Sequence, residues 1–134
     1  MKRSLTIVAA VALLLGTAYA RKPAHVVDVA AAFAQHLDHV RVEDAGEVVT
    51  TLRDDTEGSR HQRFLVRVVS GTTVLIAHNI DIAPRVAPLH RGDRVTFNGE
   101  YVWNAKGGVV HWTHHDPSGR HLSGWVRANG KTFQ

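Results

Sequence analysis

The sequence predicts a mainly β protein with one N-terminal helix, whose strands form a small OB-like antiparallel β-barrel. Three observations predict it. Apolar residues near the N-terminus recur every three or four positions, as in an amphipathic helix. Farther along they alternate with polar residues, as in strands. Three expected strands precede an irregular connection and more strands follow it, which is the OB order. The alternative is an open antiparallel sheet with the helix packed on one face.

The first twenty residues are typical of a cleaved secretory signal peptide. Basic residues 2–3 precede an apolar run over residues 5–15, and a small-residue cleavage site follows at residues 18–20. The apolar run is shorter than the roughly 20 residues that a membrane-spanning helix needs. We therefore expect a mature protein from residue 21 onward that is exported to the periplasm or the extracellular space and has no membrane anchor.

The composition of the mature chain excludes several kinds of chemistry. There is no cysteine, so disulfides, thiol catalysis and cysteine-ligated metals are excluded. Two of the 16 basic residues lie in the expected signal peptide, which leaves 14 basic against 12 acidic residues and a net charge of +2. The arginines are scattered, so charge alone neither requires nor excludes a polyanionic partner. Ten histidines make the domain more positive as the pH falls through about 6.5.

The expected elements follow from the change in hydrophobic period. Apolar residues at helical spacing between Pro23 and Val40 predict an amphipathic helix within residues 21–41. The barrel domain is expected over residues 42–134. Gly99, on the apolar face of one strand, would let that strand bend. The expected strands cover residues 46–53, 62–69, 72–78, 94–103, 109–115 and 122–127.

The end of the chain is expected to form a hairpin. Residues 116–119 are Asp, Pro, Ser and Gly, which a type I turn prefers in that order. A turn there places His114 opposite His121, with Cβ atoms about 5 Å apart across two paired strands. Such a pair is close enough to share an ion, a proton or a phosphate, and Asp116 is a candidate third ligand or an orienting carboxylate. Alternatively, both histidines are hydrogen-bonded polar ends of an aromatic face.

Four segments of the chain resemble a known family. They are HQRF at residues 61–64, IAHNID at residues 76–81, GEYVWN at residues 99–104 and GGVVHWTHHDPSGRH at residues 107–121. Together they are similar to the small exported bacterial proteins catalogued as domain of unknown function 3465, from about Glu47 to the C-terminus. The resemblance implies a compact secreted domain and supplies no activity, substrate or catalytic residue.

Two functions are consistent with these residues. The first is a non-enzymatic binding module whose aromatic rings and Arg120 hold a small ligand, a glycan or a polyanion such as a nucleic acid. The second is a metal- or histidine-dependent hydrolase, acting for example on phosphodiesters, with His114 and His121 as catalytic candidates. A divalent metal ion is the one cofactor considered, with His114, His121 and Asp116 as candidate ligands. The candidate binding residues are His61, His78, Trp103, Asn104, His111, Trp112, His114, Asp116, Arg120 and His121.

Several polar residues have simpler expected roles. We expect His25, His36 and His39 to lie on the helix in solvent. Asn79 and Asp81 follow a strand, where such side chains often bond their own backbone in a turn.

Overall fold

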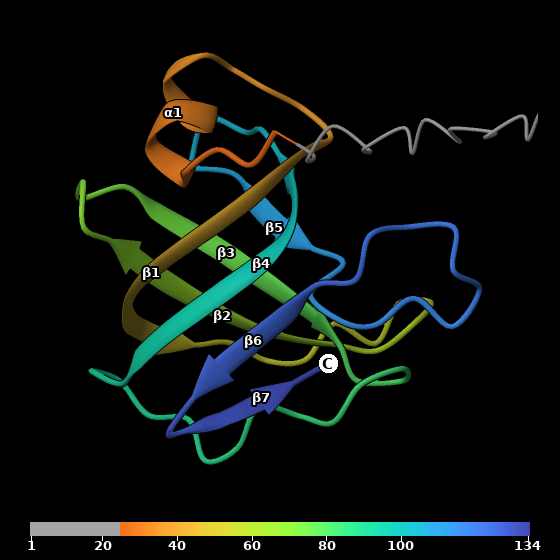
Figure 1. The fold of residues 1–134 in the computed structure, drawn as a ribbon. Coiled ribbons are helices and arrows are strands. Elements are labelled where there is room, and N and C mark those ends of the chain that lie inside the picture. The colour runs from red at the N-terminus through yellow and green to blue at the C-terminus, as the bar shows by residue number, and fades with distance from the viewer. Residues whose placement is uncertain (1–24) are drawn as a thin grey trace, which may run out of the picture.

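A computed structural model describes residues 25–134, so the expected signal peptide lies outside the described residues. One short helix and seven strands follow one another in this part of the chain (Figure 1). No helix within residues 25–134 is long and apolar enough to cross a membrane. The elements are α1 (Val29–Ala34), β1 (Val40–Thr51), β2 (His61–Val68), β3 (Thr73–Asn79), β4 (Arg94–Val102), β5 (Val109–His111), β6 (Trp125–Ala128) and β7 (Lys131–Phe133).

Five of the strands close into a barrel, which confirms the OB-like fold. The sheet order is β1-β2-β3-β5-β4, and an additional pairing of β1 with β4 joins its two ends. This closure rules out the open sheet. The β3–β5 pairing is parallel, and the other pairings are antiparallel. The long strand β1 serves two partners, because Val40 to Glu47 pair with β4 while the residues from Gly46 onward pair with β2.

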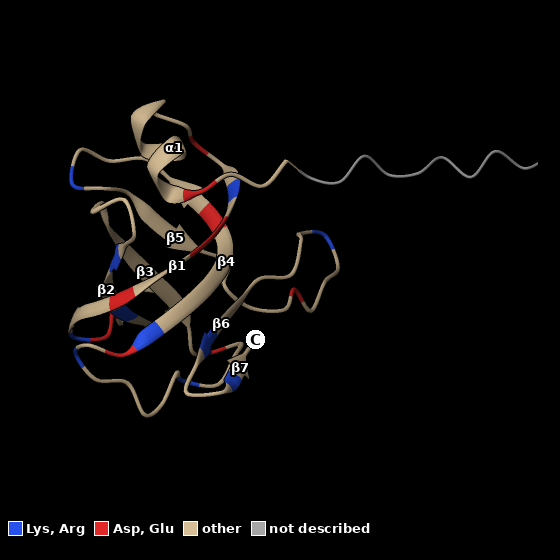
Figure 2. Ribbon diagram, turned by 60° about the vertical axis from the view of Figure 1, so that its left-hand side comes forward, with Lys and Arg blue, Asp and Glu red and all other residues tan. Residues whose placement is uncertain are grey.

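The core fills the barrel with alternate residues of each strand. Phe64, Ile76, Phe97 and Tyr101 are fully buried inside it. In Figure 1, α1 lies over one end of the barrel and the connection between β3 and β4 runs across the other. Val29 and Ala32 of α1 are fully buried. Val86 of the connection is only 1% exposed. Figure 2 shows basic and acidic residues interspersed along the strands and loops of the described part of the chain.

The expected helix over residues 23–40 is wrong in length. Pro23 lies outside the described residues, and only Val29–Ala34 are helical, with the Asp28 side chain capping the first turn. Val27 is extended and forms a parallel bridge with Val42. His36 follows the helix cap Gln35 and adopts φ of 51°, which ends the helix, and His39 adopts φ of 54° just before β1. The helical spacing arose because an extended segment, a short helix and the start of β1 each turn valines toward the core.

The expected hairpin of residues 109–115 with 122–127 is also wrong. Strand β5 stops at His111, since Trp112 has φ of 54° and leaves the sheet. Strands β5 and β6 lie end to end on the same edge of β4, paired with residues 100–102 and 95–98 respectively. Residues 112–124 form a loop between them, here called the 112–124 loop. The sequence analysis also missed β7, which pairs with β6.

Two glycines allow the chain to pack closely around this loop. A Cβ at Gly99 would lie 2.4 Å from the carbonyl oxygen of His111, and one at Gly124 would lie 2.1 Å from the carbonyl oxygen of Trp112. Real Cβ atoms do not approach oxygens so closely. Gly99 is therefore needed for the contact between β4 and β5, whatever it contributes to bending.

Candidate functional site

The buried carboxylate of Asp116 holds the backbone of the 112–124 loop. Its Oδ2 accepts hydrogen bonds from the amides of Arg120 and His121, at 2.7 and 2.6 Å. Its Oδ1 accepts from the amide and the hydroxyl of Ser118. These bonds, led by that from the His121 amide, hold the pKa of Asp116 far below its usual range. The predicted turn at residues 116–119 is present, because the Gly119 amide donates to the Asp116 carbonyl.

Strand β1 fixes the far end of the loop. The guanidinium of Arg41 donates to the carbonyl oxygen of Leu122 at 2.8 Å and also to that of Ser123. The Gly124 amide donates to the His114 carbonyl at 2.8 Å, which ties the two ends of the loop together. The loop is therefore held from within by a carboxylate and from the barrel by an arginine.

Trp112 brings the two predicted histidines together without joining them. The His121 ring stacks on the indole with centroids 4.1 Å apart, and the His114 ring lies 5.1 Å away at a tilt of 40°. His114 is only 3% exposed, whereas His121 is exposed. Among the described contacts, no hydrogen bond joins the two imidazoles. The structure brings the two histidines together around the indole of Trp112.

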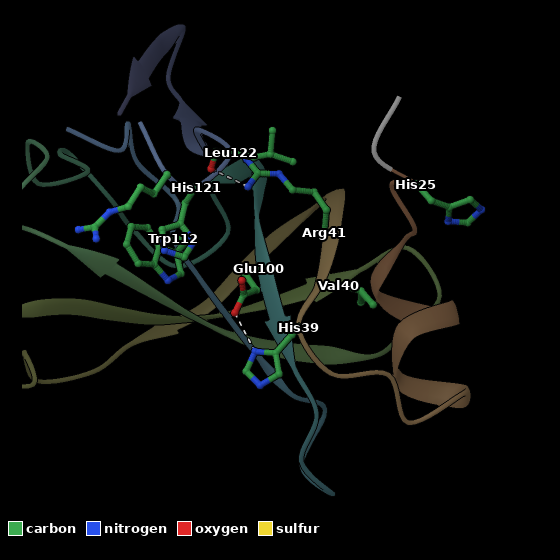
Figure 3. Close-up of a pocket in the computed structure, with 9 residues that line it drawn as sticks. His25, His39, Val40, Arg41, Glu100, Trp112, His121 and Leu122 are labelled. Atoms are coloured by element: carbon green, nitrogen blue, oxygen red, sulfur yellow. Dashed lines mark hydrogen bonds and ion pairs between the residues drawn. The ribbon is translucent and has the colours of Figure 1, made fainter. Parts of the chain in front are cut away.

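A cleft of about 430 Å³ opens between this loop and strands β1 and β4. We call it the cleft. Figure 3 shows His39 and Glu100 joined by a hydrogen bond, Arg41 reaching Leu122, and Trp112 beside His121. Basic groups outnumber the one carboxylate in the wall. The lining residues are His25, His39, Val40, Arg41, Glu100, Trp112, Arg120, His121 and Leu122.

Glu100 contacts two histidines, one directly before β1 and one at the end of β5. Its Oε1 accepts a hydrogen bond from Nδ1 of His39 at 2.9 Å and lies 3.2 Å from Nε2 of His111. The bond to Glu100 raises the pKa of His39, while burial lowers the pKa of His111. Burial alone would raise the pKa of Glu100, but the two histidines outweigh it and the pKa is lowered. His39 keeps its other ring nitrogen in solvent, because its side chain is 73% exposed.

The pattern of one protein family, described as "Protein of unknown function (DUF3465)", matches residues 11–134. The chain belongs to this family. The match begins well before Glu47, where the recognisable segments start, and it covers α1 as well as the barrel. Neither a curated protein nor a solved structure matches the chain.

The segments that resemble the DUF3465 family supply part of the cleft. GEYVWN contains Glu100, and the longest segment contains Trp112, Arg120 and His121. His39 and Arg41 lie outside every such segment. Sequence reasoning missed His39, Arg41 and Glu100 as site residues. One signal was present for Glu100, a carboxylate between two buried positions of a strand, but its neighbours depend on the β1–β4 register.

Two of the predicted site residues hold the fold together. Nε2 of His78 donates to the Pro84 carbonyl at 2.9 Å, and Nδ1 accepts from the Thr113 hydroxyl at 2.8 Å. Burial lowers the pKa of this imidazole, which favours the neutral ring. Asn104 accepts from the amides of Lys106 and Gly108 and so shapes the turn between β4 and β5. Neither residue is among those that line the cleft.

Trp103 is also structural. Its indole N–H donates to the Phe33 carbonyl at 3.1 Å, and the His36 ring stacks on it with centroids 4.1 Å apart. Trp103 therefore attaches α1 to the barrel. The expectation that His25, His36 and His39 lie on the helix is wrong, because α1 covers only Val29–Ala34. All three are exposed, as expected. As expected, Asn79 shapes a turn by accepting from the Asp81 amide.

His61 lies apart from the cleft, at the start of β2 beside His111 in a second hollow described below. The predicted three-ligand metal centre is not formed. Within residues 25–134, no three histidine, cysteine or acidic side chains lie close enough together to hold a metal ion. Both Asp116 oxygens instead accept backbone hydrogen bonds. The arrangement that remains is a basic cleft with fixed walls.

Proposed function

We propose that the protein is an exported ligand-binding module that holds an anionic ligand in the cleft. The observation that carries the proposal is the position of Arg120 and His121 on a backbone fixed by Asp116. The Arg120 side chain donates only to the Ser118 hydroxyl among the described contacts and makes no ion pair there. Its remaining donors are available to a carboxylate or a phosphate.

The rigidity of the wall supports binding over a purely structural role. A surface loop that is ordered before the ligand arrives loses little conformational entropy when it binds. The bonds from Asp116 and Arg41 supply this order, and Arg120 and His121 both line the cleft. The single carboxylate in the wall, Glu100, is hydrogen-bonded to His39, which reduces its repulsion of an anion.

Calorimetry with inorganic pyrophosphate at pH 6.0 tests the proposal. We expect saturable binding that weakens about tenfold in Arg120→Ala, the usual effect of removing one charge-assisted contact. The matched control is Arg127→Ala, because Arg127 is exposed and lies over the Trp125 ring, outside the cleft lining. Equal losses in the two variants, or no saturable binding of pyrophosphate, would contradict the proposal.

Export is a separate part of the proposal, supported by the basic, apolar and small-residue segments of residues 1–20. Expression of the full chain in a Gram-negative bacterium, followed by fractionation and mass spectrometry, tests it. We expect a periplasmic or secreted product that begins at Arg21. An uncleaved product that stays in the cytoplasm would contradict export and leave the binding proposal standing.

A second candidate function is a histidine-dependent phosphodiester hydrolase, which the His39–Glu100 contact favours. A carboxylate that holds one imidazole nitrogen leaves the other free to accept a proton. In this reaction His39 takes a proton from water as the water oxygen bonds to phosphorus, and protonated His121 gives a proton to the departing oxygen. Turnover of bis(4-nitrophenyl) phosphate tests it. Loss of turnover in His39→Ala but not in His90→Ala supports hydrolysis, and no turnover by the unaltered protein rejects it.

A further inference from the structure

A second hollow, here called the recess, lies beside the cleft on the outer face of the barrel. Its volume is about 310 Å³. Strands β2, β3, β4 and β5 all contribute to it, together with the segment between β1 and β2. Three small apolar side chains and three ionisable ones line it, and they are Ala77, Val102, Val109, Asp55, His61 and His111.

The recess and the cleft share a boundary at Glu100. In the sheet, Glu100 is paired with His111 of β5 on one side and with Arg41 of β1 on the other. His111 lines the recess, while Glu100 and Arg41 line the cleft. Two strand spacings of about 4.8 Å each separate β5 from β1. A ligand that fills the cleft therefore needs to extend across only one side chain to reach the recess.

The two hollows differ in chemistry. The cleft presents guanidinium and imidazole groups from Arg41, Arg120 and His121. The recess presents the methyl groups of Ala77 and Val109 beside the imidazole rings of His61 and His111 and the carboxylate of Asp55. A ligand that suits both has an anionic group next to a flat apolar ring. Phosphates and bases alternate in this way along a single-stranded nucleic acid, and histidine is among the side chains on which bases stack.

We propose that the cleft and the recess are two subsites for a single-stranded nucleic acid, with the phosphate of one nucleotide in the cleft and the base of the next nucleotide in the recess. The inference rests on the proposed function, since it assumes that the cleft holds an anion. The carboxylate of Glu100 lies on this path with its charge opposed by His39 and His111, which lie 2.9 and 3.2 Å away. The repulsion of a phosphate along this path is smallest at a pH at which these imidazoles are protonated.

The floor of the recess favours a base over a sugar ring. A buried sugar hydroxyl loses its water and needs a hydrogen-bonding partner. The side chains of Ala77, Val102 and Val109 offer no such partner. The flat face of a base needs none, because its hydrogen-bonding groups lie on its edges. An acidic glycan is therefore the weaker fit, although it would satisfy the charges of the cleft.

Fluorescence anisotropy with labelled oligothymidylates of one, two, four and eight nucleotides at pH 6.0 tests this proposal. We expect the affinity to rise about tenfold or more between one and four nucleotides, as a base enters the recess. Ala77→Asp places a like charge in the recess and is expected to remove that rise without changing the affinity for one nucleotide. The control is Val69→Asp, because Val69 lies in the turn between β2 and β3 and is 86% exposed. His61→Ala, with His90→Ala as its control, is a milder second test.

The outcomes separate this proposal from the one on which it rests. If pyrophosphate binds but affinity does not rise with oligothymidylate length, or if Ala77→Asp has no effect, the recess is not a subsite and the proposed function stands. If tetragalacturonate binds in the Ala77-dependent manner and the oligothymidylates do not, the ligand class is wrong. If none of these probes binds, both proposals fail.

Discussion

The inside of the barrel and the cleft use the same side chain, histidine, in opposite ways. His78 is fully buried, and both of its ring nitrogens are bonded to the protein. His39 has one nitrogen bonded to Glu100 and the rest of its ring in solvent, and His121 offers an exposed ring stacked on Trp112. A histidine with both nitrogens satisfied within the protein contributes stability. One that is held at a single nitrogen or ring face keeps a donor for a ligand.

The largest effect is expected from replacing the buried histidine. His78→Leu leaves the Thr113 hydroxyl and the Pro84 carbonyl without their partner, so the free energy of unfolding should fall by about 2–4 kcal/mol. Urea unfolding measures it. His90→Leu is the control, because the His90 side chain is 74% exposed. A loss under about 0.5 kcal/mol would show that His78 is not a structural residue.

A substitution in the 112–124 loop should weaken ligand binding more than it lowers the stability of the barrel. Asp116→Ala removes the acceptor for the amides of Ser118, Arg120 and His121, so the loop must be ordered again when the ligand binds. We expect about a tenfold weaker affinity for pyrophosphate, measured by calorimetry, and a folded barrel by circular dichroism. Asp93→Ala is matched to it, since Asp93 accepts from a turn amide outside the cleft lining. Unchanged affinity would show that the loop needs no such support.

The barrel could be predicted from the sequence better than the loop beside the cleft. The hairpin of β2 and β3 was predictable, because Phe64, Val66 and Val68 alternate with polar residues and a Gly-containing turn follows. Barrel closure followed from the order of the elements. The path of the 112–124 loop was not predictable, because nothing in the local pattern marks the left-handed conformation of Trp112 that ends β5.

The cleft was only half predictable for a different reason. Trp112, Arg120 and His121 lie close together in the chain, so local reasoning found them. Arg41 and Glu100 meet through the register of β1 with β4, which is set by distant residues. The role of Asp116 was misread in the same way, since its amide partners become visible only when the loop is folded.

Lowering the pH should reduce the stability of the barrel but increase the affinity of the cleft for pyrophosphate. The pKa of His78 is lowered from 6.5, so below that pH the unfolded chain binds a proton that the folded protein does not, and the free energy of unfolding falls. The pKa of His39 is raised, so its positive charge persists above pH 6.5 and is lost as the pH rises through the raised pKa. We therefore expect weaker stability by urea unfolding, but tighter pyrophosphate binding by calorimetry, at pH 5.5 than at pH 7.5. Parallel changes in the two quantities would break the distinction.

The smallest effect concerns the charge of Glu100. At pH 5.5 we expect His39 to be protonated with or without its partner, so Glu100→Gln mainly removes a negative charge from the cleft. The affinity for pyrophosphate should rise about two- to fivefold, the size expected for one partly exposed charge. Calorimetry at that pH measures it, with Glu57→Gln as the control at an exposed position outside the cleft lining. A fall in affinity would mean that the carboxylate is needed to hold His39 toward the ligand.

Histidine side-chain nitrogen signals, recorded by NMR during a pyrophosphate titration at pH 6.0, test the central claim most directly. We predict saturable shifts for the ring nitrogens of His39 and His121, with one common dissociation constant, and no shift for those of His78. Shifts at His78, or the absence of saturable shifts at both His39 and His121, would contradict the assignment of the cleft as the ligand site.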